Sequence, residues 1–209
     1  MAYHLCRMNE ALYNGAQSLH YMEWARLRLS SWLQLREVTV SPDIRVRRAK
    51  LSDAAAIADF VNGAHSGAPS AGNRQVAAAD VAERFGQVGF MLAQMDGQPV
   101  GLLGWQVENL VVRVTDFLVS FPADPALVGQ ALIETMESEA KALVAEAVLL
   151  FLPPSPSARL RAFWEGFGYE FQNLPELHRA WREAVIERGL ETPGVMVKRL
   201  REDAVTRPV

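Results

Sequence analysis

The chain has a single cysteine, Cys6, among its 209 residues. One cysteine excludes an intramolecular disulfide, and a chain without disulfides is typical of a reducing compartment. The first ten residues, MAYHLCRMNE, also lack the basic stretch followed by an apolar one that marks a secretory signal peptide. The sequence therefore predicts a cytoplasmic protein.

Positive charge is not in excess, and long apolar runs are missing. The formal net charge is −3, whereas nonspecific binding to nucleic acid needs a basic surplus. No apolar run reaches the ~18 residues expected of a membrane-spanning helix. His4, His20 and His178 show no spacing with acids or with Cys6 that is typical of a metal site. We therefore expect no nucleic-acid partner, no membrane span and no metal.

An apolar stripe at helical spacing runs through residues 1–37. It predicts an N-terminal helical extension, residues 1–43, which precedes the main domain. Trp24, Leu27 and Trp32 give this stripe more apolar surface than a lone peripheral helix usually presents. Two alternatives stay open: the extension packs on its own domain, or residues 18–36 form the arm of a homodimer.

Residues 44–200 carry strand and helix patterns in a definite order. A strand is followed by two helices, three strands and then alternating helices and strands. Three consecutive strands before such alternation indicate a mixed sheet. We predict an α/β (α+β) domain over residues 44–200, with a mostly antiparallel central sheet and helices on both faces. The polar residues 201–209 are expected to form a flexible tail.

The individual elements are marked by local signals. Ser52 has the position of an N-cap for a helix that ends near residue 62. Asp96 and Gly97 form the turn of a predicted hairpin. Asp124 followed by Pro125 marks the start of a helix over residues 125–145, because aspartate is a favoured N-cap and proline a favoured first helical residue.

The strand and helix on either side of Asp124 form one continuous unit, "DFLVSFPADPALVGQALIETMESEA". A strand that turns directly into a helix is a common place to hold a phosphate, because the helix N-terminus offers unpaired N–H groups and a positive dipole end. This turn contains no lysine or arginine. It holds either a phosphate-bearing cofactor or the carboxylate of its own Asp124.

The element order and three stretches resemble the GNAT superfamily of acyl-CoA-dependent N-acetyltransferases. "DFLVSFPADPALVGQALIETMESEA" looks like that family's strand, pyrophosphate loop and following helix, and "SARLRAFWEGFGYEF" is similar to its late helix. "QMDGQPVGLLGW" is similar to the hairpin between its second and third strands. The resemblance covers residues 44–200. It implies acetyl-CoA as cofactor and a small-molecule or peptide amine as acceptor.

The pyrophosphate loop departs from the family's pattern. The family's arginine or glutamine position holds Asp124, and the first glycine of its Gly-x-Gly pair is Leu127, so that only Gly129 remains. If the register is shifted by two residues, Gly129 and Ala131 form the pair, and Ala126 falls at the cationic position. The sequence leaves two alternatives: a self-capped helix with weak or no acetyl-CoA binding, or a cofactor held by backbone donors around residues 128–131.

The resemblance implies a set of site residues. The cofactor-binding positions correspond to Leu118, Val119, Val128, Gly129, Gln130, Ala131 and Ser157. Asp116, in the strand before this loop, is the first candidate for the general base that removes an amine proton. Glu108, at the end of the preceding strand, is the second candidate. The family's usual acid, a tyrosine in the late helix, is replaced by Trp164. An indole donates a hydrogen bond but supplies no proton at physiological pH.

Two functions therefore compete. One is an N-acetyltransferase that transfers an acetyl group from acetyl-CoA to an amine. The other is a catalytically degenerate protein of the same fold that acts as a ligand-binding or interaction module. Leu127 and Trp164 favour the second, and the commonest use of the fold favours the first.

Overall fold

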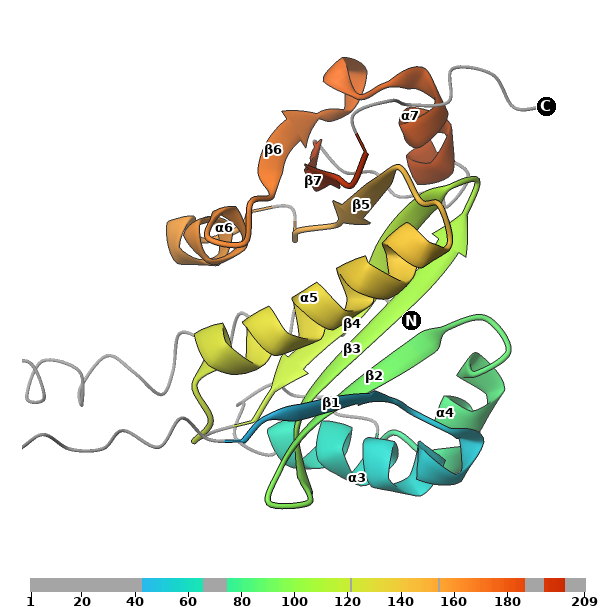
Figure 1. The fold of residues 1–209 in the computed structure, drawn as a ribbon, viewed down its shortest axis with the longest axis vertical. Helices are drawn as coiled ribbons and strands as arrows, with labels where there is room; N and C mark the ends of the chain where they lie inside the picture. Colours follow the sequence, from blue (N-terminus) through green and yellow to red (C-terminus); the bar gives the residue numbers. More distant parts are fainter. Residues whose placement is uncertain (1–42, 66–74, 121, 154, 187–193, 202–209) are drawn as a thin grey trace, which may run out of the picture.

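The computed structural model describes residues 43–65, 75–120, 122–153, 155–186 and 194–201 (Figure 1). The predicted N-terminal extension, apart from Asp43, lies outside the described residues, and so does the predicted tail, apart from Arg201. The prediction of a dimer arm over residues 18–36 is therefore not tested by the structure.

One seven-stranded sheet forms the centre, in the order β1-β2-β3-β4-β5-β7-β6. β4 and β5 pair in parallel, and the other neighbouring strands pair antiparallel. This confirms the predicted mixed, mostly antiparallel sheet. The strands are β1 (Arg45–Arg48), β2 (Gly89–Met95), β3 (Gln98–Glu108), β4 (Val111–Val119), β5 (Ala147–Leu150), β6 (Glu170–Asn173) and β7 (Gly194–Arg199).

Helices cover both faces of the sheet, as predicted (Figure 1). The long helix α5 (Pro125–Ala142) and α6 (Ala158–Glu165) lie on one face, whose core includes Leu103, Ile133 and Leu150. The other face is covered by α3 (Ala54–His65), α4 (Ala78–Arg84) and α7 (Arg179–Ile186). Neighbouring residues of β5 alternate between the two cores, because side chains of a strand point to opposite faces.

The first helix begins differently from the prediction that Ser52 caps it. Leu51–Asp53 form a short 3-10 turn before α3, and Asp53 accepts the Lys50 N–H at 2.7 Å. Arg47 donates two hydrogen bonds, of 2.8 and 2.9 Å, to the same carboxylate. The guanidinium lowers the pKa of Asp53 to about 2. The N-cap is therefore Lys50 and not Ser52, and Asp53 supports it from the third position of the turn.

β4 contains one extra residue relative to β3. Trp105 faces Val114, whereas Gly104 faces Asp116, so Thr115 is the bulged residue. A bulge inserts a residue into one strand and changes which face the following side chains point to. Strict alternation would place Asp116 on the α5 face with Val114, and the bulge places it on the opposite face.

The C-terminus of α5 contains a strained residue. Val144 has a φ of 63°, which is unusual for a β-branched side chain. The Val144 N–H donates to Lys141 O, and the Ala145 N–H donates to Ala140 O, both at 3.0 Å. This is the Schellman pattern, in which the residue in the left-handed region is usually glycine.

Val144→Gly should therefore stabilise the protein. The left-handed conformation costs a residue with a side chain ~1–2 kcal/mol, and the Val144 side chain is half exposed, so little packing is lost. After the entropy cost of a new glycine, we expect the free energy of unfolding to rise by ~0.5–1 kcal/mol in urea titrations.

Leu143→Gly is the matched control. Leu143 is equally exposed but has a φ of −86°, so glycine relieves no strain there and should lower the stability. Equal effects of the two substitutions would contradict the assignment of strain to Val144.

Candidate functional site

The parallel strands β4 and β5 separate beside the N-terminus of α5. Their ladder ends at Val114 and Leu150, whereas β4 continues to Val119. α5 starts at Pro125, a few residues after β4 ends. In open sheets, ligands bind at the carboxyl ends of parallel strands, where a helix N-terminus also provides N–H donors. The place where the backbones of β4 and β5 separate, next to α5, is called the crevice below, a name that refers only to the course of the two strands.

Asp124 caps α5 with its own side chain. Its Oδ1 accepts the Ala126 N–H at 2.8 Å, and Asp124 itself is extended, with φ −73° and ψ 115°. Pro125 has no N–H to offer. Of the helical residues 125–127, only Leu127 keeps an N–H without a partner within the part of the chain that the structure describes. The predicted N-cap at Asp124 is confirmed, and it leaves few N–H donors in the first turn of α5.

The residues after the cap point in different directions. Leu127 is 46% exposed, and Val128 is buried against Gly101 of β3. Gln130 faces solvent and donates from its amide to Glu134 at 2.8 Å. Ala131, half-buried, accepts the Thr135 hydroxyl at its carbonyl, also at a short distance of 2.7 Å. The side chain of Gln130 is thus directed along the helix surface, toward an acid.

Gly129 lies on the buried face of α5. A Cβ there would meet the ring tips of Phe117, Phe163 and Phe167 at 3.2–3.3 Å. The sequence suggested that this glycine opens the backbone to a pyrophosphate. In the structure, the space next to its Cα is taken by aromatic rings.

The resemblance also implied cofactor contacts for Leu118, Val119 and Ser157, and each of these side chains packs or bonds within the protein. Leu118 is buried with the α3 and α4 core, on the face opposite α5. Val119 is half-buried and packs on the α5 side. Ser157 caps α6, accepting the Leu160 N–H at 3.2 Å. The Leu118 side chain is therefore turned away from the crevice, whereas Val119 borders it.

Asp116, the first candidate for the general base, forms an ion pair with Arg84 of α4. The Arg84 Nη1 donates to Asp116 Oδ1 at 3.1 Å, and Nη2 donates to Oδ2. The Thr115 hydroxyl also donates to Oδ2, at 2.7 Å. The Asp116 side chain is 1% exposed, and that of Arg84 is 30% exposed. A bidentate pair of this kind is a strong charge-assisted contact, and it occupies both oxygens of the carboxylate.

The space for this carboxylate is provided by Gly104 of β3. A Cβ at Gly104 would meet the Asp116 carboxylate and the Thr115 hydroxyl at distances that side chains do not tolerate. Packing against Asp116 and Thr115 thus explains why the second glycine of the "GLLGW" stretch, Gly104, has no side chain. Sequence reasoning missed Arg84, since an arginine in the last turn of a short helix gives no signal for a partner 32 residues away.

Glu108, the second candidate base, is the last residue of β3 and lies beside the start of β4, away from the N-terminus of α5. It faces Val111 and forms an ion pair of 2.9 Å with Arg113. Val111 is eight residues before Val119, which corresponds to ~26 Å along a strand. The structure therefore does not bring Glu108 together with Asp116 or with α5's N-terminus.

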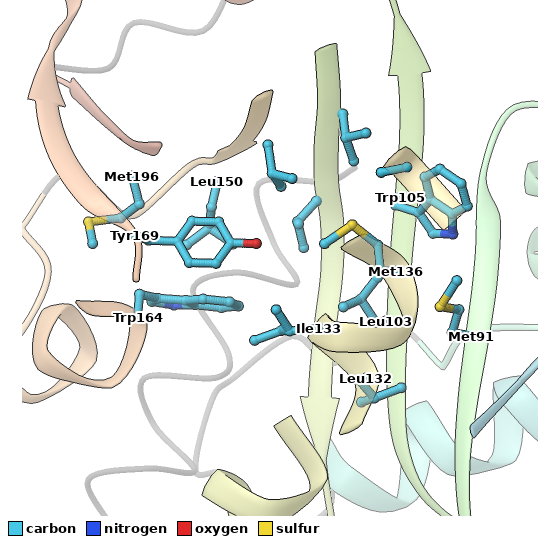
Figure 2. Close-up of a cluster of buried hydrophobic side chains, with 14 of the residues drawn as sticks. Met91, Leu103, Trp105, Leu132, Ile133, Met136, Leu150, Trp164, Tyr169 and Met196 are labelled. Atoms are coloured by element: carbon cyan, nitrogen blue, oxygen red, sulfur yellow. The ribbon is translucent and has the colours of Figure 1, made fainter. Parts of the chain in front are cut away.

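Trp164 is a core residue. It is 3% exposed, and its ring packs edge-on against Phe117 at 4.9 Å and against Tyr169 at 5.6 Å between centroids. Figure 2 shows Trp164 and Tyr169 side by side, directed toward Ile133 of α5. The position where the family commonly has its acid is thus filled by an indole that holds α6 against the sheet.

Tyr169 carries the phenol that packs beside this position. It is buried, and its hydroxyl donates to Glu137 at 3.3 Å. Lys198 bonds the same carboxylate at 2.8 Å. Burial raises the pKa of Tyr169 well above its usual value near 10, and the negative charge of Glu137 adds to this shift. The hydroxyl is engaged in a buried polar contact that joins α5 and β7, so Tyr169 has a structural role.

Within the described ranges, no three or more His, Cys, Asp or Glu residues gather in a way that could hold a metal ion. Among the same residues, no helix is long and apolar enough to cross a membrane.

Comparison with known proteins identifies the fold. No protein-family model matches the chain, and no curated protein matches it in sequence. Solved structures of GNAT acetyltransferases do match it in structure. A GNAT-family acetyltransferase from Staphylococcus aureus Mu50 is 12% identical, with a TM-score of 0.57, over 76% of this chain and 99% of that one.

Two further structures give the same result. A GNAT-superfamily phosphinothricin acetyltransferase from Sinorhizobium meliloti, solved with acetyl-CoA, is 16% identical, with a TM-score of 0.57, over 79% of this chain and 93% of that one. The ribosomal-protein-S18-alanine N-acetyltransferase from Escherichia coli is 12% identical, with a TM-score of 0.54, over 79% and 99%. The chain therefore has the GNAT fold that the sequence predicted.

Proposed function

We propose that the protein is an N-acyltransferase that transfers an acetyl group from acetyl-CoA to the amine of a small molecule or peptide. The observation that carries this proposal is the separation of β4 from β5 beside α5's N-terminus, in a sheet with the GNAT fold. Strand ends and a helix N-terminus together form a binding place for a phosphate-bearing ligand. Solved structures with the same fold include an acetyltransferase in complex with acetyl-CoA.

The residues of the crevice define what the protein contributes to this reaction. The thioester of acetyl-CoA supplies the activated acyl group when it is bound. Asp116 is held by Arg84 and Thr115, and Trp164 supplies no proton. The amine is therefore expected to arrive as the free base. As its nitrogen forms the amide bond and the carbon–sulfur bond of the thioester breaks, the nitrogen would release one proton to solvent and the leaving thiolate would take one from solvent. The protein would act by positioning the two reactants, which is itself a substantial source of rate enhancement.

A second candidate, a non-catalytic ligand-binding or interaction module, is favoured by one specific set of observations. Asp124 occupies the cap of α5, and aromatic rings surround Gly129. A phosphate ~5 Å from the Asp124 carboxylate would experience ~3 kcal/mol of repulsion at an effective dielectric near 20. This corresponds to roughly a hundredfold loss of affinity before solvent screening.

Calorimetric titration with acetyl-CoA and with free CoA tests both candidates. Because the cap is filled, we expect a dissociation constant no tighter than ~0.1–1 mM, which corresponds to about 4–5.5 kcal/mol. Acetyl transfer to any of a panel of primary amines, measured as release of free thiol, would support the acyltransferase. Weak binding without transfer would support the non-catalytic module, and low-micromolar binding would contradict the self-capping argument.

We also propose that the protein is a cytoplasmic homodimer joined through residues 18–36. The support is the single cysteine and the apolar stripe with Trp24 and Trp32. Light scattering should give twice the chain mass for the whole protein, and the chain mass for a truncated chain that begins at Ser41. A whole chain that stays monomeric at high concentration would rule out this dimer.

A further inference from the structure

Four exposed apolar side chains gather at one end of the domain. Val107 lies near the end of β3, Leu110 lies in the turn to β4, and Leu143 and Val144 follow α5 directly. The two segments meet, because the Leu110 carbonyl accepts the Glu146 N–H at 2.7 Å. Figure 1 shows the β3–β4 turn and the C-terminus of α5 at the same end of the sheet. These four residues are called the apolar end below. They are four of the seven large apolar side chains that are exposed in the described part of the chain.

Two of these side chains stand on strained backbone. Leu110 and Val144 both have a φ of 63°, a left-handed conformation that favours glycine. Neither belongs to a core of the domain, so internal packing does not account for an apolar side chain at either position. Strained residues are typical of functional sites, and exposed apolar side chains that gather in one place mark contact surfaces. The apolar end therefore has the character of a surface that a partner covers.

The described chain begins at the opposite end of the domain. Asp43 lies just before β1, whose first residue, Arg45, pairs with Gln94 beside the β2–β3 turn. From that turn, β3 runs 11 residues toward the apolar end, which corresponds to ~36 Å along a strand. Residues 37–43 span at most ~24 Å. Residues 18–36, called the arm below, therefore reach the apolar end of their own domain only by running lengthwise over it.

The surface along that route does not match the arm. The outer face of α5 joins the two ends of the domain, and its exposed middle is polar, with Gln130, Glu134, Ser138 and Lys141. The arm has an apolar stripe that includes two tryptophans, which gain nothing on a polar surface. A second copy removes this limit. If two copies pair about a two-fold axis with their α5 helices antiparallel, the start of β1 in each copy lies beside the apolar end of the other.

We propose that the apolar end receives the arm of a second copy of this chain. This inference rests on the homodimer proposed above and is independent of acyl transfer. Trp24 and Trp32 bury ~150–250 Å² each, so two reciprocal arms bury ~600–1,000 Å² through these rings and cover a similar area of the two domains. The total of ~1,200–2,000 Å² is the size of a stable, specific interface.

Light scattering over a dilution series of the whole chain measures the dissociation constant of the dimer. Val107→Glu with Leu143→Glu places two charges in the apolar end and should weaken the dimer roughly tenfold or more, because a charge covered by tryptophan is costly to desolvate. Leu51→Glu is the matched control: Leu51 is 60% exposed and lies directly before α3, which covers the opposite face of the sheet. It should leave the dimer unchanged.

Disulfide cross-linking identifies the copy that supplies the arm. In chains whose only native thiol is removed by Cys6→Ser, Leu27→Cys labels the arm of one protein and Leu143→Cys labels the apolar end of another. An equal mixture of the two, oxidised with glutathione disulfide, should give a cross-linked pair that contains one chain of each kind. Leu51→Cys in place of Leu143→Cys is the control and should give no such pair.

Three outcomes would overturn the inference. If Leu27→Cys and Leu143→Cys in one chain form a disulfide within that chain, the arm covers its own domain. If the parent is a dimer that Val107→Glu with Leu143→Glu does not weaken, the homodimer stands but its arm binds elsewhere. If the parent is a monomer at high concentration, both the homodimer and this inference fail. Acetyl transfer enters none of these measurements, so a protein without transfer activity leaves the test unchanged.

Discussion

Arg84→Leu should lower the free energy of unfolding by ~3 kcal/mol at neutral pH, the largest effect on stability that we expect from a single substitution. The Asp116 carboxylate is 1% exposed and its ion-pair partner is Arg84. Leucine leaves that carboxylate buried opposite an apolar side chain. A buried charge without a partner is far more costly than the net gain from forming the pair. The lower end of the range usual for breaking a buried ion pair applies, because the Arg84 side chain is itself 30% exposed.

Urea unfolding of the variant and of two controls measures this effect. Arg84→Leu combined with Asp116→Val removes both charges and should recover most of the loss. Arg179→Leu removes an arginine from the exposed pair with Glu183, and it should change stability by less than ~0.5 kcal/mol. A loss below ~1 kcal/mol for Arg84→Leu alone would mean that solvent reaches Asp116.

Repair of the loop should give the largest effect on ligand binding. Asp124→Arg with Pro125→Gly and Leu127→Gly is expected to tighten CoA binding at least tenfold, or by about 1.4 kcal/mol. The variant removes the capping carboxylate, adds an arginine that pairs with phosphate and restores one backbone N–H. Leu127 is 46% exposed, so little packing is lost there. The lost helix cap costs ~1 kcal/mol of stability.

Calorimetry at low and physiological salt tests this prediction, since the gain should be greatest at low salt. Asp124→Asn is the matched control, because asparagine caps a helix as well as aspartate but carries no charge. It should give part of the gain, through loss of repulsion alone. Acetyl transfer should stay slow in the triple variant, since Trp164 still supplies no proton.

A folded triple variant that binds CoA no better than its parent would contradict the placement of the cofactor at Gly129. It would also indicate that the crevice is closed elsewhere. Combining the triple variant with Phe163→Ala then distinguishes a ring that blocks the donor from a wrongly placed site.

The sequence by itself determined the features that depend on neighbouring residues. The hairpin turn at Asp96-Gly97 and the cap at Asp124 followed from local backbone preferences, and the structure confirms both. The order of the strands and helices, and with it the mixed sheet, followed from the period of the apolar residues. Each of these signals spans only a few residues, so a single sequence contains it.

Only the tertiary structure decided what surrounds the candidate site. Strict alternation along β4 would have placed Asp116 toward α5, but the bulge at Thr115 turns it to the other face, where Arg84 holds it. A bulge is a relation between two strands, and it leaves no mark in either strand alone. Likewise, Gly129 signalled an open backbone in the sequence, while the fold brings Phe163 of α6 against it. Both outcomes depend on residues far apart in the chain, whose meeting is fixed by packing.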